Sequence, residues 1–104
     1  MTKPLAYVVS IRFEWDPAKE AINLKKHGLS FGEVTGLFTS GTDFLELLDT
    51  AHDYEGDRLI AIGPVARGVV MVVFTERHED TIRIISARRA TRTEIVLYRQ
   101  HLEG

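Results

Sequence analysis

The stretch DPAKEAINLKKHGLSFGEV, residues 16–34, contains the signals that decide the fold. Asp16 before Pro17 is typical of a helix start, because an aspartate N-cap accepts a hydrogen bond from a free backbone N–H and proline suits the first helical position. Gly28 is a candidate C-cap for the same helix. Ser30 to Glu33 is a capping box, which predicts a second helix directly after the turn. The stretch therefore predicts two helices joined by a tight turn.

The second predicted helix carries an apolar stripe by which it would enter the core. Val34, Leu37 and Phe38 follow the i, i+3, i+4 spacing of one helix face. Leu29 precedes the capping box and is placed to pack against Val34 as a hydrophobic staple. We therefore expect this helix to be held by burial of its apolar face.

The rest of the chain consists of runs rich in β-branched residues, separated by polar turns. Strands are expected at Val8 to Trp15, Asp43 to Leu48, Arg58 to Gly63, Val69 to Thr75 and Thr81 to Ala87. Thr91 to Glu94 is another capping box and opens a last helix, on which Ile95, Tyr98 and Leu102 share one face. The order β-α-α-β-β-β-β-α predicts an α+β domain with helices packed on one face of a largely antiparallel sheet.

The length and composition of the chain predict one compact domain over residues 1–104. With 104 residues, of which 44% are hydrophobic, the chain can bury a single core. It has no cysteine, which excludes a disulfide framework, a thiolate nucleophile and cysteine-ligated zinc. No apolar run reaches the roughly 18 residues that cross a bilayer, and the N-terminus lacks a signal-peptide core. We therefore expect a cytoplasmic protein that does not bind membranes.

Charge is distributed unevenly along the chain. The 13 Lys+Arg and 15 Asp+Glu leave a formal net charge of −2. Residues 43–57 nevertheless hold six acids and no Lys or Arg, whereas residues 77–99 hold six arginines and three acids. This asymmetry favours a basic surface for an anionic partner beside an acidic surface for a basic protein. An ordinary solvated face is an equal alternative for the acidic part.

The segment RIISARRATRTE, Arg83 to Glu94, places arginines where the last strand meets the last helix. Strict strand alternation puts Arg88 on the same face as Ile82, Ile84 and Ser86. A guanidinium that ends such an apolar row, beside a helix N-terminus, can hold a phosphate with its fork of donors. Pairing of Arg88 with an internal carboxylate, such as that of Glu94 or Glu33, is an alternative of equal weight.

Lys26 and His27 lie at the C-terminal end of the first helix. Cations suit the negative end of a helix dipole, and histidine can cap the last carbonyls, so a structural role is one interpretation. The functional interpretation is proton transfer or phosphate binding, because an imidazole exchanges protons near neutral pH. The four histidines are scattered and have no metal-binding spacing, so no metal site is predicted.

Four motifs in order, FEWDPAKEAINLKKHGLSFGEV, DRLIAIG, VVFTER and TIRIISARRATRTE, followed by a late tyrosine, resemble the BrnT family of type II toxins. The resemblance covers about Phe13 to Tyr98. It implies a RelE-like α+β fold and a ribonuclease that inhibits translation by cutting RNA. It also implies neutralisation by a BrnA-like antitoxin, which is a ribbon-helix-helix protein. The toxin–antitoxin complex would bind operator DNA through the antitoxin only.

The same motifs carry candidate site residues onto this chain. The catalytic candidates are His27 and Lys26 from K-H-G, Arg58 from D-R-x-x-x-x-G, and Arg88 from I-S-A-R-R. The candidates for RNA or phosphate binding are Arg77, Arg89, Arg92 and Tyr98, although a tyrosine on an amphipathic helix face is more often part of the core.

The chemistry that these residue types suit needs no metal and no cofactor. The 2′-hydroxyl of RNA attacks the adjacent phosphate while a base removes its proton, cations stabilise the phosphorane, and an acid protonates the departing 5′-oxygen. Arg88 and Arg58 would hold the phosphate, His27 would be the base or the acid, and Lys26 would assist electrostatically.

Three features depart from the family pattern. Residues 1–12 form an atypical N-terminal extension that runs into the first strand, the last helix is less basic than is usual in the family, and the acidic residues 43–57 could repel RNA. One alternative is therefore a catalytically inactive homologue that binds the antitoxin in operon autoregulation. Another is a small globular domain whose arginines are structural.

Overall fold

The computed structural model describes residues 11–49 and 58–104 of the chain. Its elements are β1 (Arg12–Glu14), α1 (Pro17–His27), α2 (Phe31–Val34), α3 (Gly36–Thr39), β2 (Leu45–Leu48), β3 (Leu59–Val65), β4 (Gly68–Arg77), β5 (Thr81–Arg89) and α4 (Arg92–Glu103). Three expected features lie outside the described residues: the start of the first strand at Val8, most of the N-terminal extension and the second half of the acidic segment. None of the helices in the described part is long and apolar enough to cross a membrane.

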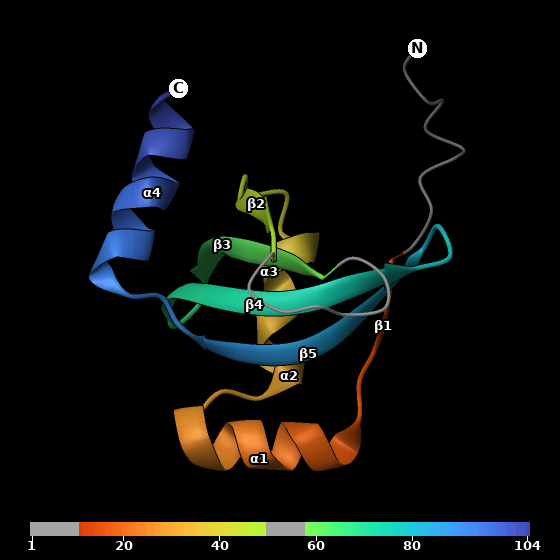
Figure 1. Cartoon of the computed structure of the whole chain (residues 1–104). Coiled ribbons are helices and arrows are strands. Elements are labelled where there is room, and N and C mark those ends of the chain that lie inside the picture. The colour runs from red at the N-terminus through yellow and green to blue at the C-terminus, as the bar shows by residue number, and fades with distance from the viewer. Residues whose placement is uncertain (1–10, 50–57) are drawn as a thin grey trace.

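The five strands form one mixed sheet in the order β1-β5-β4-β3-β2 (Figure 1). Antiparallel pairing joins β2 to β3, β3 to β4 and β4 to β5, as the short connections between the later strands predict. β1 is the exception, because it pairs with β5 in parallel. The expectation of an α+β domain with a largely antiparallel sheet is confirmed.

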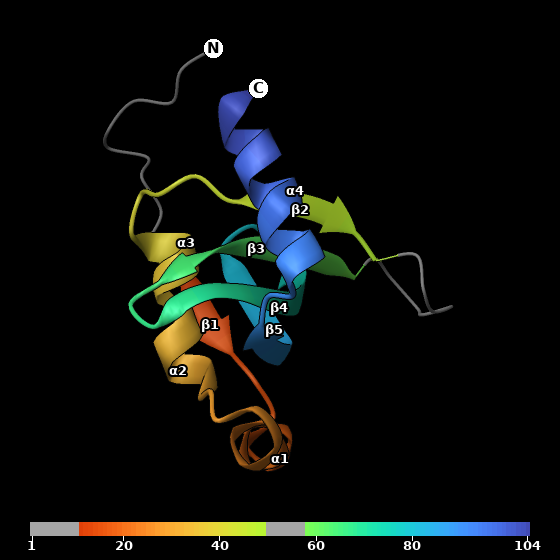
Figure 2. The same ribbon diagram turned by 90° about the vertical axis from the view of Figure 1, so that its left-hand side faces the viewer.

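Helices cover both faces of this sheet. α2 and α3 bury Phe31, Val34 and Leu37 against one face and form the main core there. α4 lies on the other face, beside β3 and β2 (Figures 1 and 2). Ile62 of β3 alternates with core residues, so its side chain points to the second face, yet it is only 2% exposed. The expectation that all helices share one face is therefore wrong for α4, since the second face also has an apolar surface to bury.

The helix ends follow the capping signals. Asp16 Oδ1 accepts a hydrogen bond from the Ala18 N–H at 2.9 Å, and Gly28 has φ 70° after the last residue of α1. Both capping boxes form, at Ser30 before α2 and at Thr91 before α4. These local predictions are confirmed.

The second predicted helix is divided into α2 and α3, so the predicted element order lacks one helix. The break is at Thr35, whose hydroxyl donates to the Gly32 carbonyl at 2.8 Å. A threonine hydroxyl that takes up a backbone carbonyl competes with the helical hydrogen bond, and Gly32 and Gly36 have low helix propensity. These residues therefore interrupt the helix at Thr35.

Close packing of α3 on the sheet depends on a glycine in β3. A Cβ at Gly63 would lie 2.6 Å from Leu37 Cδ1 and 2.7 Å from Phe44 Cβ. Phe38 of the same helix packs edge-on against Phe74 of β4, with ring centroids 5.0 Å apart. A larger residue at position 63 would separate α3 from the aromatic part of the core.

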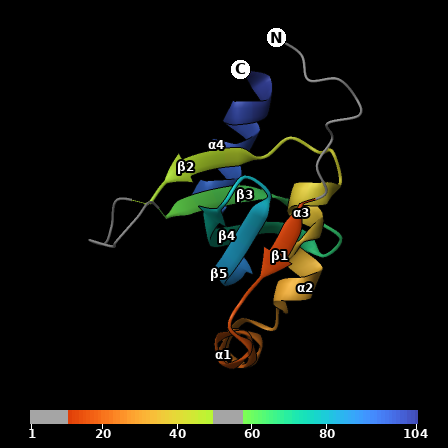
Figure 3. The same cartoon turned by 90° about the vertical axis from the view of Figure 1, so that its right-hand side faces the viewer.

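α1 covers the edge of β5 that β1 leaves unpaired. β1 pairs only with Thr81, Ile82 and Arg83, whereas α1 runs along the rest of β5 (Figure 1). Figure 3, in which α1 is seen end-on, shows β1 beside β5. The Asn23 side chain accepts a hydrogen bond from the Ala87 N–H at 3.0 Å and donates to the Ala87 carbonyl at 2.8 Å. It also donates to the Leu29 carbonyl at 3.1 Å, and Asn23 is only 5% exposed. The Asn23 side chain thus makes the hydrogen bonds to the Ala87 backbone that a neighbouring strand would otherwise make.

A β-bulge in β5 changes which side chains face the core. The register passes from Phe74 opposite Ile84 to Val73 opposite Ser86, so Ile85 is the extra residue. As a result Ile84 and Ala87 both enter the main core, and Arg88 points to the second face of the sheet. The expectation that Arg88 shares a face with Ile82 and Ile84 is wrong, because strict alternation does not hold across the bulge.

An ion pair links the end of β5 to α4. Arg88 Nη1 and Nη2 donate to the two carboxylate oxygens of Glu94, each at 2.8 Å. Glu94 Oε1 also accepts the Thr91 N–H at 2.8 Å. The hydrogen bonds from Arg88, above all, and from the Thr91 backbone lower the pKa of Glu94 against the opposing effect of burial. Pairing with Glu94, one of the two alternatives for Arg88, is thus present in the structure.

Replacing Asn23 by leucine should destabilise the fold by about 3 kcal/mol or more, because the Ala87 N–H and two carbonyls would stay buried without partners. Urea unfolding of the variant and the parent measures this difference. Lys25→Ala on the exposed side of α1 is the control and should change stability by less than about 0.5 kcal/mol. Equal effects of the two substitutions would show that the Asn23 hydrogen bonds do not hold α1 in place.

Replacing Glu94 by glutamine should lower the unfolding free energy by about 1 to 2 kcal/mol near neutral pH and by less in acid. The lowered pKa of Glu94 means that its ion pair stabilises the fold above the usual glutamate pKa of about 4.3. That contribution is lost as the pH falls through the lowered pKa of the folded state. Glutamine can keep the capping box, so the comparison isolates the charge. Urea unfolding at neutral and acidic pH measures both differences, and a pH-independent difference would contradict this account.

Candidate functional site

Four arginines project from the sheet face opposite α2 and α3. Leu59 and Ile84 pack into the main core, so strand alternation turns the neighbouring Arg58 and Arg83 to the other face. Arg77 lies there as well, three residues after the buried Phe74. We define the arginine face as the surface formed by Arg58, Arg77, Arg83 and Arg88. Three of these residues were candidates from the sequence, and β3, β4 and β5 bring them onto one surface.

The arginine face keeps an excess of positive charge although carboxylates lie on it. Glu14 Oε1 is 3.5 Å from Arg77 Nε and 3.8 Å from Arg83 Nη1. These pairs are half-exposed and long, so they hold the side chains only weakly. Glu94 is bound to Arg88, and Asp49 lies opposite Arg58, one residue beyond the pair of Leu48 with Leu59. Four guanidinium charges against three carboxylate charges leave a formal excess of one positive charge. Such a surface attracts anions.

The C-terminal end of α1 meets this face across a small cavity. The cavity has a volume of about 210 Å³, and its lining includes Lys26, His27, Ile85 and Ser86. Ser86 pairs with Val73 on the side of the sheet that also carries Arg88. Two residues along a strand span roughly 7 Å, so Arg88 begins close to the cavity rim. The structure therefore brings Lys26 and His27 to the same side of β5 as Arg88.

Three other candidates from the sequence lie elsewhere or serve the fold. Arg89 is on the opposite face, where its Nη1 donates to the Arg67 carbonyl at 3.1 Å. Arg92 is exposed in the first turn of α4. Tyr98 is 7% exposed, and its hydroxyl donates to the Asp43 carbonyl at 3.2 Å, so it holds α4 against the start of β2. The core interpretation of Tyr98 agrees with this burial.

Two residues of the site were not candidates from the sequence. Arg83 lies between Ile82 and Ile84, and Glu14 follows Phe13. These three apolar neighbours belong to the main core or pack against it. Alternation around these apolar neighbours is the signal that could have assigned both to the opposite face. Their meeting depends on the parallel pairing of β1 with β5, in which Glu14 lies opposite Arg83.

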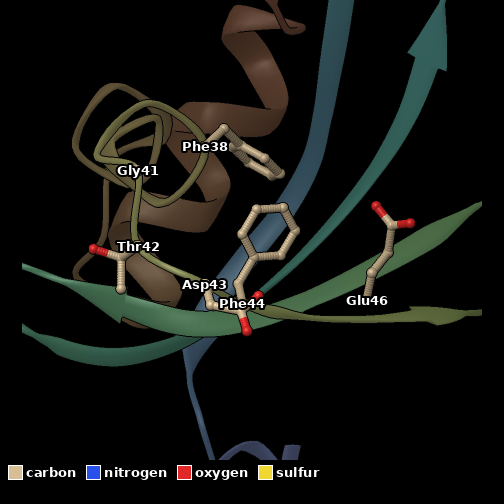
Figure 4. A pocket seen from close by; sticks show the side chains of 6 residues that line it. All are labelled: Phe38, Gly41, Thr42, Asp43, Phe44 and Glu46. Atoms are coloured by element: carbon tan, nitrogen blue, oxygen red, sulfur yellow. The ribbon is translucent and has the colours of Figure 1, made fainter. Parts of the chain in front are cut away.

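A larger cavity of about 550 Å³ lies between α3 and the start of β2 (Figure 4). The rings of Phe38 and Phe44 meet edge to face beside it, with centroids 5.4 Å apart. Its charged lining residues, Asp43 and Glu46, are both acidic. Carboxylates there would repel a phosphate backbone, so this cavity does not suit RNA. Within residues 11–49 and 58–104, no three histidine or acidic side chains gather as metal ligands would.

Comparison with known proteins assigns the chain to a family. The sequence model described as "Ribonuclease toxin, BrnT, of type II toxin-antitoxin system" matches residues 15–94, which include α1 and the whole of β5. The 1.1 Å crystal structure of the Brucella abortus ribonuclease toxin BrnT is similar, with a TM-score of 0.60 and 26% identity over 80% of this chain and 100% of that one. No curated protein matches the chain. The chain therefore belongs to the family of BrnT ribonuclease toxins of type II toxin-antitoxin systems.

Proposed function

We propose that this chain is an endoribonuclease toxin that cuts RNA at the arginine face and thereby inhibits translation. One observation carries the proposal: Arg58, Arg83 and Arg88 point to the same side of the sheet as the cavity that Lys26 and His27 line. Guanidinium forks bind phosphate oxygens in pairs, and an imidazole can take and return a proton near neutral pH. The description of the family as ribonuclease toxins supports the reaction class.

The proposed reaction uses the RNA's own 2′-hydroxyl as the nucleophile. Its oxygen attacks the adjacent phosphorus and the bond to the 5′-oxygen breaks, which leaves a 2′,3′-cyclic phosphate. Arg88 and Arg58 would bind the non-bridging oxygens and stabilise the phosphorane. His27 would remove the 2′ proton or protonate the 5′-oxygen, and the Lys26 ammonium would lower the energy of the developing charge.

The Arg88 guanidinium can bind a phosphate while Glu94 holds it. Nη1 donates to Glu94 and to the Arg89 carbonyl, and Nη2 donates to Glu94. The second contact of Nη2 is to Met71 Sδ at 3.6 Å, which is weak because a thioether sulfur is a poor acceptor. Arg88 has a side chain that is 32% exposed, so a phosphate oxygen could replace the sulfur. Glu94 would then orient Arg88.

We infer that the antitoxin is a BrnA-like ribbon-helix-helix protein. Type II family membership implies an antitoxin partner. Asp43, Glu46 and Asp49 form the described part of the acidic segment, and charge of this sign suits a basic protein and steers its approach. Operator DNA would be bound through the antitoxin alone. A reading frame for a short ribbon-helix-helix protein beside this one would support the assignment, and its absence would weaken it.

Purified, antitoxin-free protein should cut RNA in EDTA and leave 2′,3′-cyclic phosphate ends. Arg88→Ala alone would leave Glu94 half-buried and unpaired, so the informative variant combines Arg88→Ala with Glu94→Gln. Loss of a phosphate donor should lower the cleavage rate of this variant about 100-fold or more. Mapping of the cut ends and the initial rates measures both results.

The control for this experiment is Glu94→Gln alone, which keeps Arg88 and should cut within a few-fold of the parent. Arg99→Ala combined with Glu94→Gln removes an exposed arginine of α4 instead of Arg88 and has the same net charge as the double variant, so it controls for the loss of one positive charge. A folded double variant as fast as Glu94→Gln would disprove the role of Arg88. Intact RNA under conditions in which the Brucella toxin cuts would favour the inactive, antitoxin-binding alternative.

His27→Gln should reduce the cleavage rate by a factor of about 100 or more and remove its dependence on pH near neutrality, because an amide cannot exchange a proton there. Rates of the parent and the variant across this pH range test the assignment. His101→Gln, at the far end of α4, is the matched control and should keep both the rate and the pH profile. An unchanged profile in His27→Gln would exclude proton transfer by this imidazole.

A further inference from the structure

The cavity beside α1 is lined in part by apolar side chains that the proposed phosphate chemistry does not use. Ile22 of α1 and Ile85 of β5 both line it. Ile22 is 67% exposed and is not part of the main core. Ile85 is the extra residue of the bulge, and bulges re-aim side chains beside active sites. Two isoleucines thus line the cavity.

The rim of the cavity is cationic and polar. Lys19, Lys26 and His27 border it from α1, and Ser86 borders it from β5. Ammonium groups and the Ser86 hydroxyl can hydrogen-bond to the carbonyl and ring-nitrogen acceptors of a flat heterocycle. Apolar side chains together with a few polar groups are the usual lining of a small-ligand site.

The size of the cavity suits one aromatic ring system. Its volume of about 210 Å³ is below the roughly 300 to 1,000 Å³ of sites for drug-sized ligands. It is several times the share of one water molecule, about 30 Å³ in the liquid. A single nucleobase is larger than a water molecule and smaller than a drug-sized ligand, so it suits a cavity of this size.

The position of the cavity relates this ring to the proposed cleavage site. Ser86 lies at the rim, and Arg88 follows two residues later on the same side of β5. In single-stranded RNA each base is one sugar away from its phosphate, and protein sites commonly hold such a splayed base between apolar side chains. A phosphate at Arg88 therefore places a neighbouring base within reach of Ile22 and Ile85.

We propose that this cavity is a subsite for one unstacked nucleobase of single-stranded RNA and that it sets the base preference beside the cut. The proposal rests on the proposed function, because the phosphate at Arg88 orients the nucleotide. Ile22 and Ile85 contact the faces of the base, and Ser86 and Lys19 contact its edge.

Titration with each of the four nucleoside 3′-monophosphates, followed by NMR of the isoleucine methyl groups, tests the subsite without any cleavage. At least one nucleotide should shift the methyl signals of Ile22 and Ile85 to saturation, with a Kd of about 1 mM. Ribose 5-phosphate and inorganic phosphate, which lack a base, should not shift them. Ile22→Ser should weaken the nucleotide binding about fivefold, whereas Leu24→Ser, at another exposed apolar position on α1, should leave it unchanged.

Either of two results would overturn the subsite: no saturable shift with any nucleotide, or equal shifts with ribose 5-phosphate. Both can be read whether or not the protein cuts RNA, so they are distinct from a failure of the proposed ribonuclease activity. In protein that cuts, Ile22→Ser should also change which bases flank the cut and raise KM with little change in kcat. An unchanged base preference in that variant would count against the proposal as well.

Discussion

The hydrogen bonds between the Asn23 side chain and the Ala87 backbone hold together the part of the molecule on which the site depends. β1 covers only the first three residues of β5, so the backbone beyond Arg83 would lie open at the sheet edge. Asn23 satisfies both polar groups of Ala87, which stands between Ser86 and Arg88. His27 follows Asn23 by four residues and therefore lies on the same side of α1. One buried amide thus sets the distance between the imidazole and the arginine strand.

The bulge at Ile85 is the second constraint. Without the extra residue, Arg88 would alternate onto the face that α2 and α3 cover, where a guanidinium has no place in the apolar core. With it, Ile84 and Ala87 both remain in the core and Arg88 emerges beside Arg83 and Arg58. The same extra residue turns Ile85 toward α1. The sheet therefore combines a continuous core on one face with a cationic row on the other.

Two glutamates moderate the charge of that row. Glu94 holds Arg88 through two short hydrogen bonds, and Glu14 lies between Arg77 and Arg83 at longer distances. Each carboxylate comes from an element that borders the sheet, α4 or β1. Arg88 is thereby kept in position before an anion arrives, which reduces the entropy lost on binding, whereas Glu14 holds Arg77 and Arg83 only weakly. The negative net charge of the whole chain is consistent with an anion-binding surface, because the excess of positive charge is local to the arginine face.

Signals that act within a few residues determined what the sequence alone could predict. The caps at Asp16, Gly28, Ser30 and Thr91 satisfy nearby backbone groups, so they define helix ends in any tertiary context. The ordered motifs determined the family and most of the candidate residues. The arrangement of α4 on the second face, the bulge and the role of Asn23 depend on partners far along the chain, and only the tertiary structure decided them. Alternation gives no local sign of an extra strand residue, and an asparagine within a helix does not show which distant backbone it will pair with.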